Sequence, residues 1–119
     1  MTWPVEVTGE FEAWYAGLAE TDREAVNAAV DALEERGPGL GRPLVGEIVG
    51  SRHGQLKELR IGTTRILFRF DARRTAILLV GGDKHGEWKA WYRTAIPVAD
   101  GLYDVYIAEL QKEGLLPRE

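Results

Sequence analysis

The stretch from Gln55 to Tyr92 constrains the fold of this chain more than any other part of the sequence. Polar and apolar residues alternate along it, which is typical of strands that bury one face. Three short strands fit this pattern, at residues 56–61, 65–71 and 76–81. Two short turns join them, at residues 62–64 and 71–74. Turns of this length predict hairpins.

The alternation gives the first two of these strands one apolar face and one charged face. The apolar face collects Leu59, Ile61, Ile66, Phe68 and Phe70. The opposite face collects Glu58, Arg60, Arg65 and Arg69. We therefore expect a charged surface with three guanidinium groups on one side of the sheet. Lys57 points to the other side by the same rule.

Two amphipathic helices are predicted before this stretch. Thr8 can cap the first helix, whose apolar residues are spaced i, i+3, i+4, i+7 at Phe11, Trp14, Tyr15 and Leu18. Thr21 and Glu24 have the capping-box pattern at the start of the second helix, whose apolar residues are Val26, Ala29, Val30 and Leu33. Gly37 and Pro38 end it. The pair indicates a helical hairpin that packs both apolar stripes on a sheet.

The remaining segments complete the predicted order of elements. Residues 3–7 are prone to form a first strand, and residues 37–54, with six glycines and two prolines, read as a loop with a short strand near residues 47–49. Pro97 is expected in the first turn of a last helix, with an apolar face of Ala99, Leu102, Tyr103, Tyr106 and Leu110. The tail at residues 114–119 is expected to fray.

The order is therefore strand, two helices, three strands and two helices. Runs of like elements, rather than strict alternation, predict an α+β fold with a helical hairpin on a small, mostly antiparallel sheet. A chain of 119 residues is expected to form one domain, residues 1–119. No apolar run approaches the roughly 20 residues of a membrane helix, the N-terminus does not resemble a signal peptide, and cysteine is absent. We expect a cytoplasmic protein without a membrane partner.

Charge is distributed unevenly along the chain. Residues 1–50 hold 3 Lys and Arg against 10 Asp and Glu, residues 51–93 hold 10 against 4, and residues 94–119 hold 2 against 5. A basic middle between acidic ends is typical of a polyanion-binding face on an acidic body. Ordinary surface charge is the alternative interpretation.

Three motifs resemble a known family in their order and spacing. They are Lys57-Glu58-Leu59-Arg60, Arg65-Ile66-Leu67-Phe68, and the strand from Leu79 that runs into Lys84. Together with the flanking helices they resemble the RelE/ParE toxin superfamily, and most closely its HigB-like, phage-derived branch. The resemblance extends from the helical hairpin to about Leu110.

The resemblance implies a function. RelE-type members are endoribonucleases that cut mRNA on the ribosome through attack of a ribose 2′-OH on the adjacent phosphate, and ParE-type members inhibit DNA gyrase. Both are neutralised by a small antitoxin, which for HigB-like toxins is usually a helix-turn-helix protein. The implied partners are thus a cognate helix-turn-helix antitoxin and mRNA on the ribosome. No cofactor is implied.

The chemistry requires a base, cations on the phosphate and a proton for the leaving oxygen. Arg65 matches the family's arginine at the start of the second hairpin strand and is the first candidate to stabilise charge on the phosphate, with Arg60 across from it on the same face. Lys84 matches the lysine at the strand exit, and His85 follows it as a candidate acid or base. Glu58 is either a carboxylate base or the ion-pair partner of Arg60 or Arg65. His85 has the alternative interpretation of a solvated loop histidine.

Trp88, Trp91 and Tyr92 are spaced i, i+3, i+4 and would share one helix face. At least two of them are expected to be buried, with Tyr92 the exposed one and a candidate member of the catalytic set. The candidate RNA-binding residues are Lys57, Arg69, Arg73, Lys89, Arg93 and Trp91, because RNA sites combine cations with aromatic rings.

Three functions therefore compete: an mRNA endoribonuclease, a ParE-like gyrase inhibitor that only binds, and a regulator that binds an antitoxin but is no longer toxic. RelE has lysines where this chain has Leu56 and Glu58, which keeps the second alternative open. A metal enzyme is not expected, because two histidines 32 positions apart and no cysteine form no recognisable ligand set.

Overall fold

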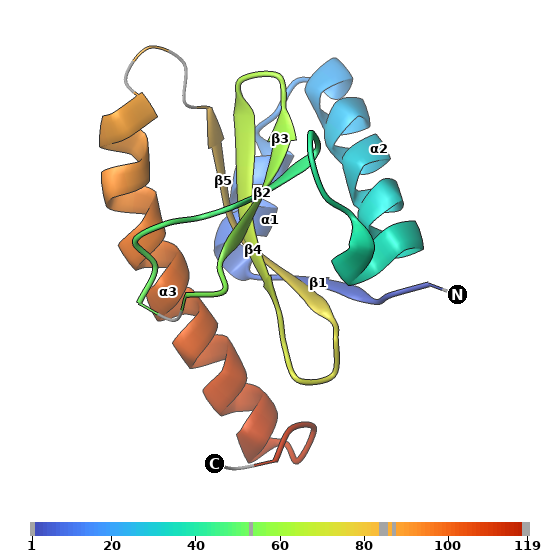
Figure 1. The fold of residues 1–119 in the computed structure, drawn as a ribbon, viewed down its shortest axis with the longest axis vertical. Helices are drawn as coiled ribbons and strands as arrows, with labels where there is room; N and C mark the ends of the chain where they lie inside the picture. The colour runs from blue at the N-terminus through green and yellow to red at the C-terminus, as the bar shows by residue number, and fades with distance from the viewer. Residues whose placement is uncertain (1, 53, 84–85, 87, 118–119) are drawn as a thin grey trace.

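A computed structural model describes residues 2–52, 54–83, 86 and 88–117. In these residues a five-stranded sheet lies between helices on its two faces (Figure 1). The strands are β1 (Val5–Val7), β2 (Val45–Glu47), β3 (Lys57–Ile61), β4 (Thr64–Phe70) and β5 (Ala76–Asp83). The helices are α1 (Gly9–Ala16), α2 (Glu20–Arg36), the 3₁₀ turn η1 (Gly37–Gly39) and α3 (Trp88–Lys112). The predicted α+β class is confirmed.

The sheet has the order β1-β5-β4-β3-β2. The pairs β2–β3, β3–β4 and β4–β5 are antiparallel, as predicted. β1 runs parallel to β5 at one edge, so the sheet is mixed. The short strand expected near residues 47–49 forms earlier, at Val45–Glu47.

One face of the sheet packs against α1 and α2. Leu59, Ile66 and Phe68 are fully buried there, in a core completed by the helical residues Phe11, Val26 and Leu33. The predicted cap of α1 is confirmed, because the Thr8 hydroxyl accepts a hydrogen bond of 3.1 Å from the Phe11 N–H. The same hydroxyl donates to the Leu79 carbonyl at 2.6 Å, so it joins the start of α1 to β5.

Two adjacent glycines of β5 allow helices to approach the sheet closely on both faces. A Cβ atom on Gly81 would lie 2.3 Å from the ring of Trp14 in α1, and one on Gly82 would lie 2.2 Å from the indole nitrogen of Trp91 in α3. Successive strand residues face opposite sides of a sheet. The two tryptophans therefore cover opposite faces of β5.

The capping box predicted for α2 is wrong. α2 begins at Glu20 with Ala19 as its N-cap and no side-chain cap, so Thr21 and Glu24 lie inside its first turns. Glu20 and Asp22 place negative charge there, which the helix dipole favours. The predicted end is confirmed, because Gly37 has φ 54° and its N–H bonds the Leu33 carbonyl.

The prediction of two separate C-terminal helices is also wrong, because α3 is one helix of 25 residues with Pro97 inside it. Pro97 is exposed, while Ala95, Ala99 and Tyr103 are buried against the sheet. This stripe at four-residue spacing continues through the proline, and its burial offsets the missing backbone hydrogen bond. No helix in the described part of the chain is long and apolar enough to span a membrane.

The tail does not fray directly after α3. Gly114, with φ 77°, closes the helix, as its N–H bonds the Gln111 carbonyl at 3.1 Å and the Leu115 N–H bonds the Leu110 carbonyl at 2.9 Å. This is the pattern of a Schellman motif. It turns Leu116 back into a buried position, where 7% of its surface is exposed.

Candidate active site

The charged residues of the central hairpin lie on the face that α3 covers. Arg60 of β3 pairs directly with Arg65 of β4, and Arg65 pairs with Gly82 of β5. Glu58 lies two residues before Arg60 and on the same face. Figure 1 shows the β3–β4 turn and the first turns of α3 at one end of the sheet. The predicted grouping of Glu58, Arg60 and Arg65 is therefore present.

The expected open charged surface is wrong, because most of this face is buried. Only 4% of Glu58 and 8% of Arg65 are exposed. Leu67, which lies between Arg65 and Arg69 on β4, is fully buried with Ile77 and Leu79 beneath α3. These apolar residues draw the helix onto the sheet, and it encloses the charges beside them.

Glu58 is the centre of the cluster. Its carboxylate accepts a hydrogen bond from the Tyr92 hydroxyl at 2.5 Å and one from Arg60 Nε at 3.0 Å. Arg65 Nε lies 3.6 Å from the same carboxylate. The predicted pairing of Glu58 with Arg60 or Arg65 is confirmed, and it involves both arginines.

Tyr92 serves this cluster as a hydrogen-bond donor. Burial, and then the neighbouring Glu58 carboxylate, raise the pKa of Tyr92 to about 12, although Arg65 acts in the opposite direction. The hydroxyl therefore keeps its proton at neutral pH. Both Trp91 and Tyr92 are half-buried, and the most exposed ring of the three is Trp88, with 48% of its surface exposed. The expected burial of two rings is therefore only partial, and the choice of Tyr92 as the exposed one is wrong.

Arg65 has a structural function in addition to its ion pair. Its Nη1 atom donates to the carbonyls of Gly62, at 2.6 Å, and of Thr64, at 2.9 Å. Gly62 has φ 60°, so the guanidinium stabilises a turn that requires glycine. Arg65 is thus held between the β3–β4 turn and Glu58.

Arg60 is the more accessible of the two arginines, with 34% of its side chain exposed. Among the described residues, its side chain has one hydrogen bond, from Nε to Glu58. A third of this side chain is therefore accessible to a ligand. Gly46 and Gly82, which lie under Arg60 and Trp91, were missed from the sequence. Their cross-strand positions would have been the only signal, and these depend on the register.

The other candidate residues are spread over the molecule. Lys84 and His85 lie outside the described residues. Lys89 and Arg93 are exposed in α3, and Lys89 Nζ lies 5.6 Å from the centre of the Trp88 ring. Lys57 lies on the opposite face, as predicted, with its Nζ 5.7 Å from the centre of the Phe70 ring.

Arg69 lies further along β4. Its guanidinium carbon is 4.3 Å from the centre of the Tyr103 ring. Its Nε and Nη1 are buried and have no hydrogen-bond partner in the described part of the chain. This arginine packs on α3 and is separated from Arg65 by three strand residues, so it is not part of the Glu58 cluster.

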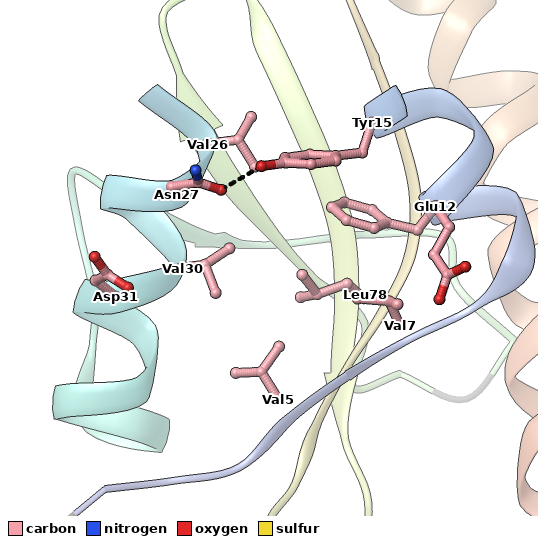
Figure 2. Close-up of a pocket in the computed structure, with 10 residues that line it drawn as sticks. Val5, Val7, Glu12, Tyr15, Val26, Asn27, Val30, Asp31 and Leu78 are labelled. Carbon is pink, nitrogen blue, oxygen red and sulfur yellow. Dashed lines mark hydrogen bonds between the residues drawn. The ribbon is translucent and has the colours of Figure 1, made fainter. Parts of the chain in front are cut away.

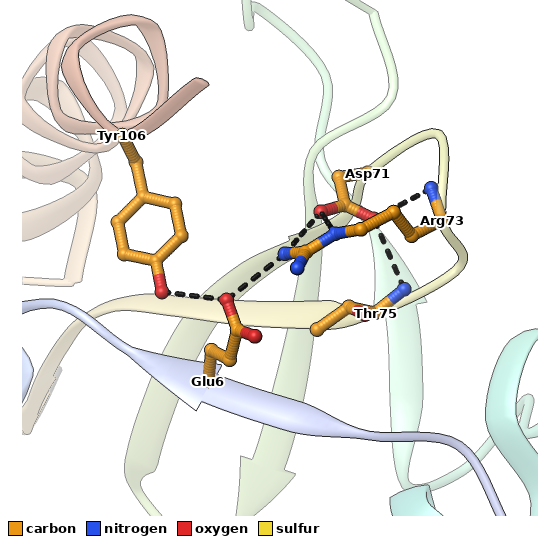
Figure 3. Close-up of polar contacts among 5 residues, drawn as sticks. All are labelled: Glu6, Asp71, Arg73, Thr75 and Tyr106. Carbon is orange, nitrogen blue, oxygen red and sulfur yellow. Dashed lines mark hydrogen bonds and ion pairs between the residues drawn. The ribbon is translucent and has the colours of Figure 1, made fainter. Parts of the chain in front are cut away.

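Arg73 belongs to a second polar cluster at the β4–β5 turn (Figure 3). It contacts Asp71 at 2.7 Å and Glu6 at 2.9 Å, and the Tyr106 hydroxyl donates to Glu6 at 2.7 Å. Burial alone would raise the pKa of Glu6, but the hydrogen bonds from Arg73 and Tyr106 lower it below its ordinary value. The cluster ties β1, the turn and α3 together, and it occupies the guanidinium of Arg73.

A groove of about 550 Å³ lies on the other face, between β1, α1 and α2 (Figure 2). Its floor is apolar, with Val5, Val26 and Leu78 among its lining residues. At its rim the Tyr15 hydroxyl donates to Asn27 at 2.6 Å. None of the described residues that line the groove is a lysine or an arginine, so the groove does not suit a phosphate group. In the described residues, no group of three or more His, Cys, Asp or Glu side chains is arranged to hold a metal ion.

A sequence profile decides the family. The profile of the family described as "Phage derived protein Gp49-like" matches residues 13–104. The chain belongs to this Gp49-like family. Residues 13–104 include the end of α1, all of α2, the strands β2 to β5 and most of α3, so the match covers the whole Glu58 cluster.

Two relatives of this Gp49-like protein come from Mycobacterium tuberculosis, and both are described as toxins. HigB2 is 43% identical over 114 residues, which cover 92% of this chain. The chain spans only 56% of HigB2. HigB3 is 46% identical over 101 residues, which cover 83% of this chain and 89% of HigB3.

Solved structures of low identity show the fold of the Gp49-like protein. The archaeal RelE–RelB complex from Pyrococcus horikoshii matches with a TM-score of 0.59 at 18% identity, over 72% of this chain and 99% of the matched chain. The toxin–antitoxin complex RelBE2 from M. tuberculosis matches with a TM-score of 0.57 at 18% identity, over 70% of this chain and 99% of the matched chain. The predicted RelE-like fold is confirmed.

Proposed function

We propose that this Gp49-like protein is the toxin of a type II toxin–antitoxin system. Its relatives HigB2 and HigB3 are described as toxins, and it shares the fold of chains from RelE–RelB and RelBE2 complexes. Its partner is a cognate antitoxin, a small helix-turn-helix protein. The activity of the toxin is cleavage of mRNA on the ribosome, by attack of a ribose 2′-OH on the adjacent phosphate.

The observation that carries this function is the buried Glu58 carboxylate, which lies between Arg60, Arg65 and Tyr92. A cation next to a phosphate stabilises the charge that develops in the transition state. Arg60 fits that function because its side chain is partly exposed and a planar guanidinium can bind two phosphate oxygens. Arg65 stabilises the same site through its ion pair with Glu58 and its bond to the Gly62 carbonyl.

Glu58 and Tyr92 supply groups for the proton transfers. The 2′-OH must lose a proton, and a carboxylate beside the phosphate site is suited to accept it. The 5′-oxygen must gain a proton, and Tyr92 retains its proton at neutral pH. Lys84 and His85 remain proposed participants that follow β5 directly. The products carry a 2′,3′-cyclic phosphate and a 5′-OH, and the reaction consumes no water.

The remaining proposed contacts to RNA come from the exposed start of α3. Trp88, Lys89 and Arg93 are exposed there. An exposed ring beside cations can stack on a base while the cations bind the backbone. Arg69 and Arg73 are occupied by contacts within the fold, so they contribute less to this surface.

The test is cleavage of a defined mRNA on purified ribosomes, with analysis of the 3′ ends. Wild-type protein should leave cyclic phosphate ends, and Arg60→Ala should reduce the rate by about 10²-fold, the usual effect of losing a charge-stabilising group. An exposed arginine outside the cluster, Arg36→Ala, is the control and should cleave like wild type. Intact mRNA together with loss of DNA supercoiling by gyrase would instead identify a ParE-like inhibitor.

A further inference from the structure

The guanidinium of Arg60 lies against Gly46 of β2. A Cβ atom built on Gly46 would lie 2.2 Å from Arg60 Nη2, 2.6 Å from Cζ and 3.0 Å from Nε. Gly46 pairs with Glu58 in the β2–β3 register. The guanidinium therefore occupies the space that any other residue at position 46 would fill with its own side chain.

Gly46 differs from the other closely contacted glycines of the chain. Gly37, Gly81 and Gly82 each lie against a tryptophan ring, from Trp3, Trp14 and Trp91 respectively. Those rings are large groups packed into the fold, whereas the guanidinium of Arg60 is the end of a flexible and partly exposed side chain. A methyl group at position 46 can therefore displace Arg60 without disturbing the core.

The position over Gly46 determines which atoms of Arg60 are available. With the guanidinium against Gly46, Nε donates to Glu58 at 3.0 Å. About a third of the Arg60 side chain, 34%, remains exposed. We propose that Gly46 is a positioning residue, which holds the Arg60 guanidinium in the orientation that binds the scissile phosphate of mRNA. This inference rests on the proposed function, and it concerns the same site.

The test compares Gly46→Ala with Gly39→Ala, because a Cβ atom on Gly39 would have no atom within 4 Å. The readout is the single-turnover rate of mRNA cleavage on the ribosome, together with the melting temperature. Gly46→Ala should lower the rate roughly tenfold or more, the size expected when a charge-assisted hydrogen bond is lost. Its melting temperature should fall no further than that of Arg60→Ala, and Gly39→Ala should match wild type in both readouts.

A double-mutant cycle separates the proposed role from a general defect. In the Arg60→Ala background, Gly46→Ala should cause no further loss of rate, because the displaced group is already absent. Equal cleavage by wild type and Gly46→Ala would overturn this inference but not the proposed function. The inference would also fail if the double variant lost rate by the product of the two single losses. Wild-type protein that leaves ribosome-bound mRNA intact would overturn the proposed function and the inference with it.

Discussion

The Tyr92 hydroxyl donates a hydrogen bond of 2.5 Å to Glu58, which lies 34 positions earlier in the chain. This bond joins α3 to β3 at the candidate active site. It also satisfies part of a carboxylate that is almost completely buried. The geometry of the site therefore depends on the correct docking of α3.

Tyr92→Phe should destabilise the protein by about 1–3 kcal/mol, the cost of leaving a buried polar group without its partner. The measurement is the free energy of unfolding in urea. Tyr15→Phe is the matched control, because the bond from Tyr15 to Asn27 is exposed. Loss of that exposed bond should reduce the free energy of unfolding by less than Tyr92→Phe does. Equal effects of the two variants would contradict the importance assigned to the Glu58 contact.

Replacement of the two site arginines should affect stability differently. Arg65→Ala removes two hydrogen bonds to turn carbonyls as well as an ion pair with buried Glu58, so it should cost roughly 2–4 kcal/mol. Arg60→Ala removes a partly exposed side chain and should cost about 1 kcal/mol or less. Chemical denaturation of both variants checks this order. The opposite order would mean that Arg60 is the structural arginine.

Leu33→Ala should reduce the free energy of unfolding by roughly 2–5 kcal/mol, as for other buried large-to-small changes. Leu33 is fully buried between α2 and the sheet. Val49→Ala provides the comparison, because 92% of Val49 is exposed, and it should change stability by no more than about 0.5 kcal/mol. A small effect of Leu33→Ala would contradict the placement of α2.

The Glu6 cluster should contribute to stability in a pH-dependent way. The pKa of Glu6 is lower in the folded protein than its ordinary value of 4.5. Its stabilising effect is therefore complete above that value and is lost as the pH falls through the folded pKa. Glu6→Gln should make the melting temperature less sensitive to pH in the acid range. Glu35→Gln, at an exposed position of α2, should keep the wild-type pH dependence.

Expression of the protein alone should arrest bacterial growth, and co-expression of a helix-turn-helix protein encoded beside it should restore growth. Growth curves with immunoblots of the soluble fraction provide the measurement. The Arg60→Ala variant should be tolerated at the same expression level. Normal growth with abundant soluble wild-type protein would favour the regulator that has lost its toxicity.

Residue periodicity predicted the strands, the hairpin stripes and the grouping of Glu58 with Arg60 and Arg65, because these depend on contacts near in sequence. It failed where distant packing decides. Burial of Ala95, Ala99 and Tyr103 keeps α3 continuous through Pro97, although proline locally disfavours a helix. The same helix covers a sheet face whose charged residues alone suggested that it was exposed to solvent. The position of Gly46 under Arg60 could not be predicted, because it requires the β2–β3 register.

The pairing of β1 with β5 has a consequence for synthesis of the protein. Val7 pairs with Leu78, and the Thr8 hydroxyl at the start of α1 bonds the Leu79 carbonyl, 71 positions later. β1 thus leaves the ribosome about 70 residues before the strand with which it pairs. Tyr92 emerges later still. A nascent chain would consequently acquire an assembled site only after Tyr92 has left the ribosome.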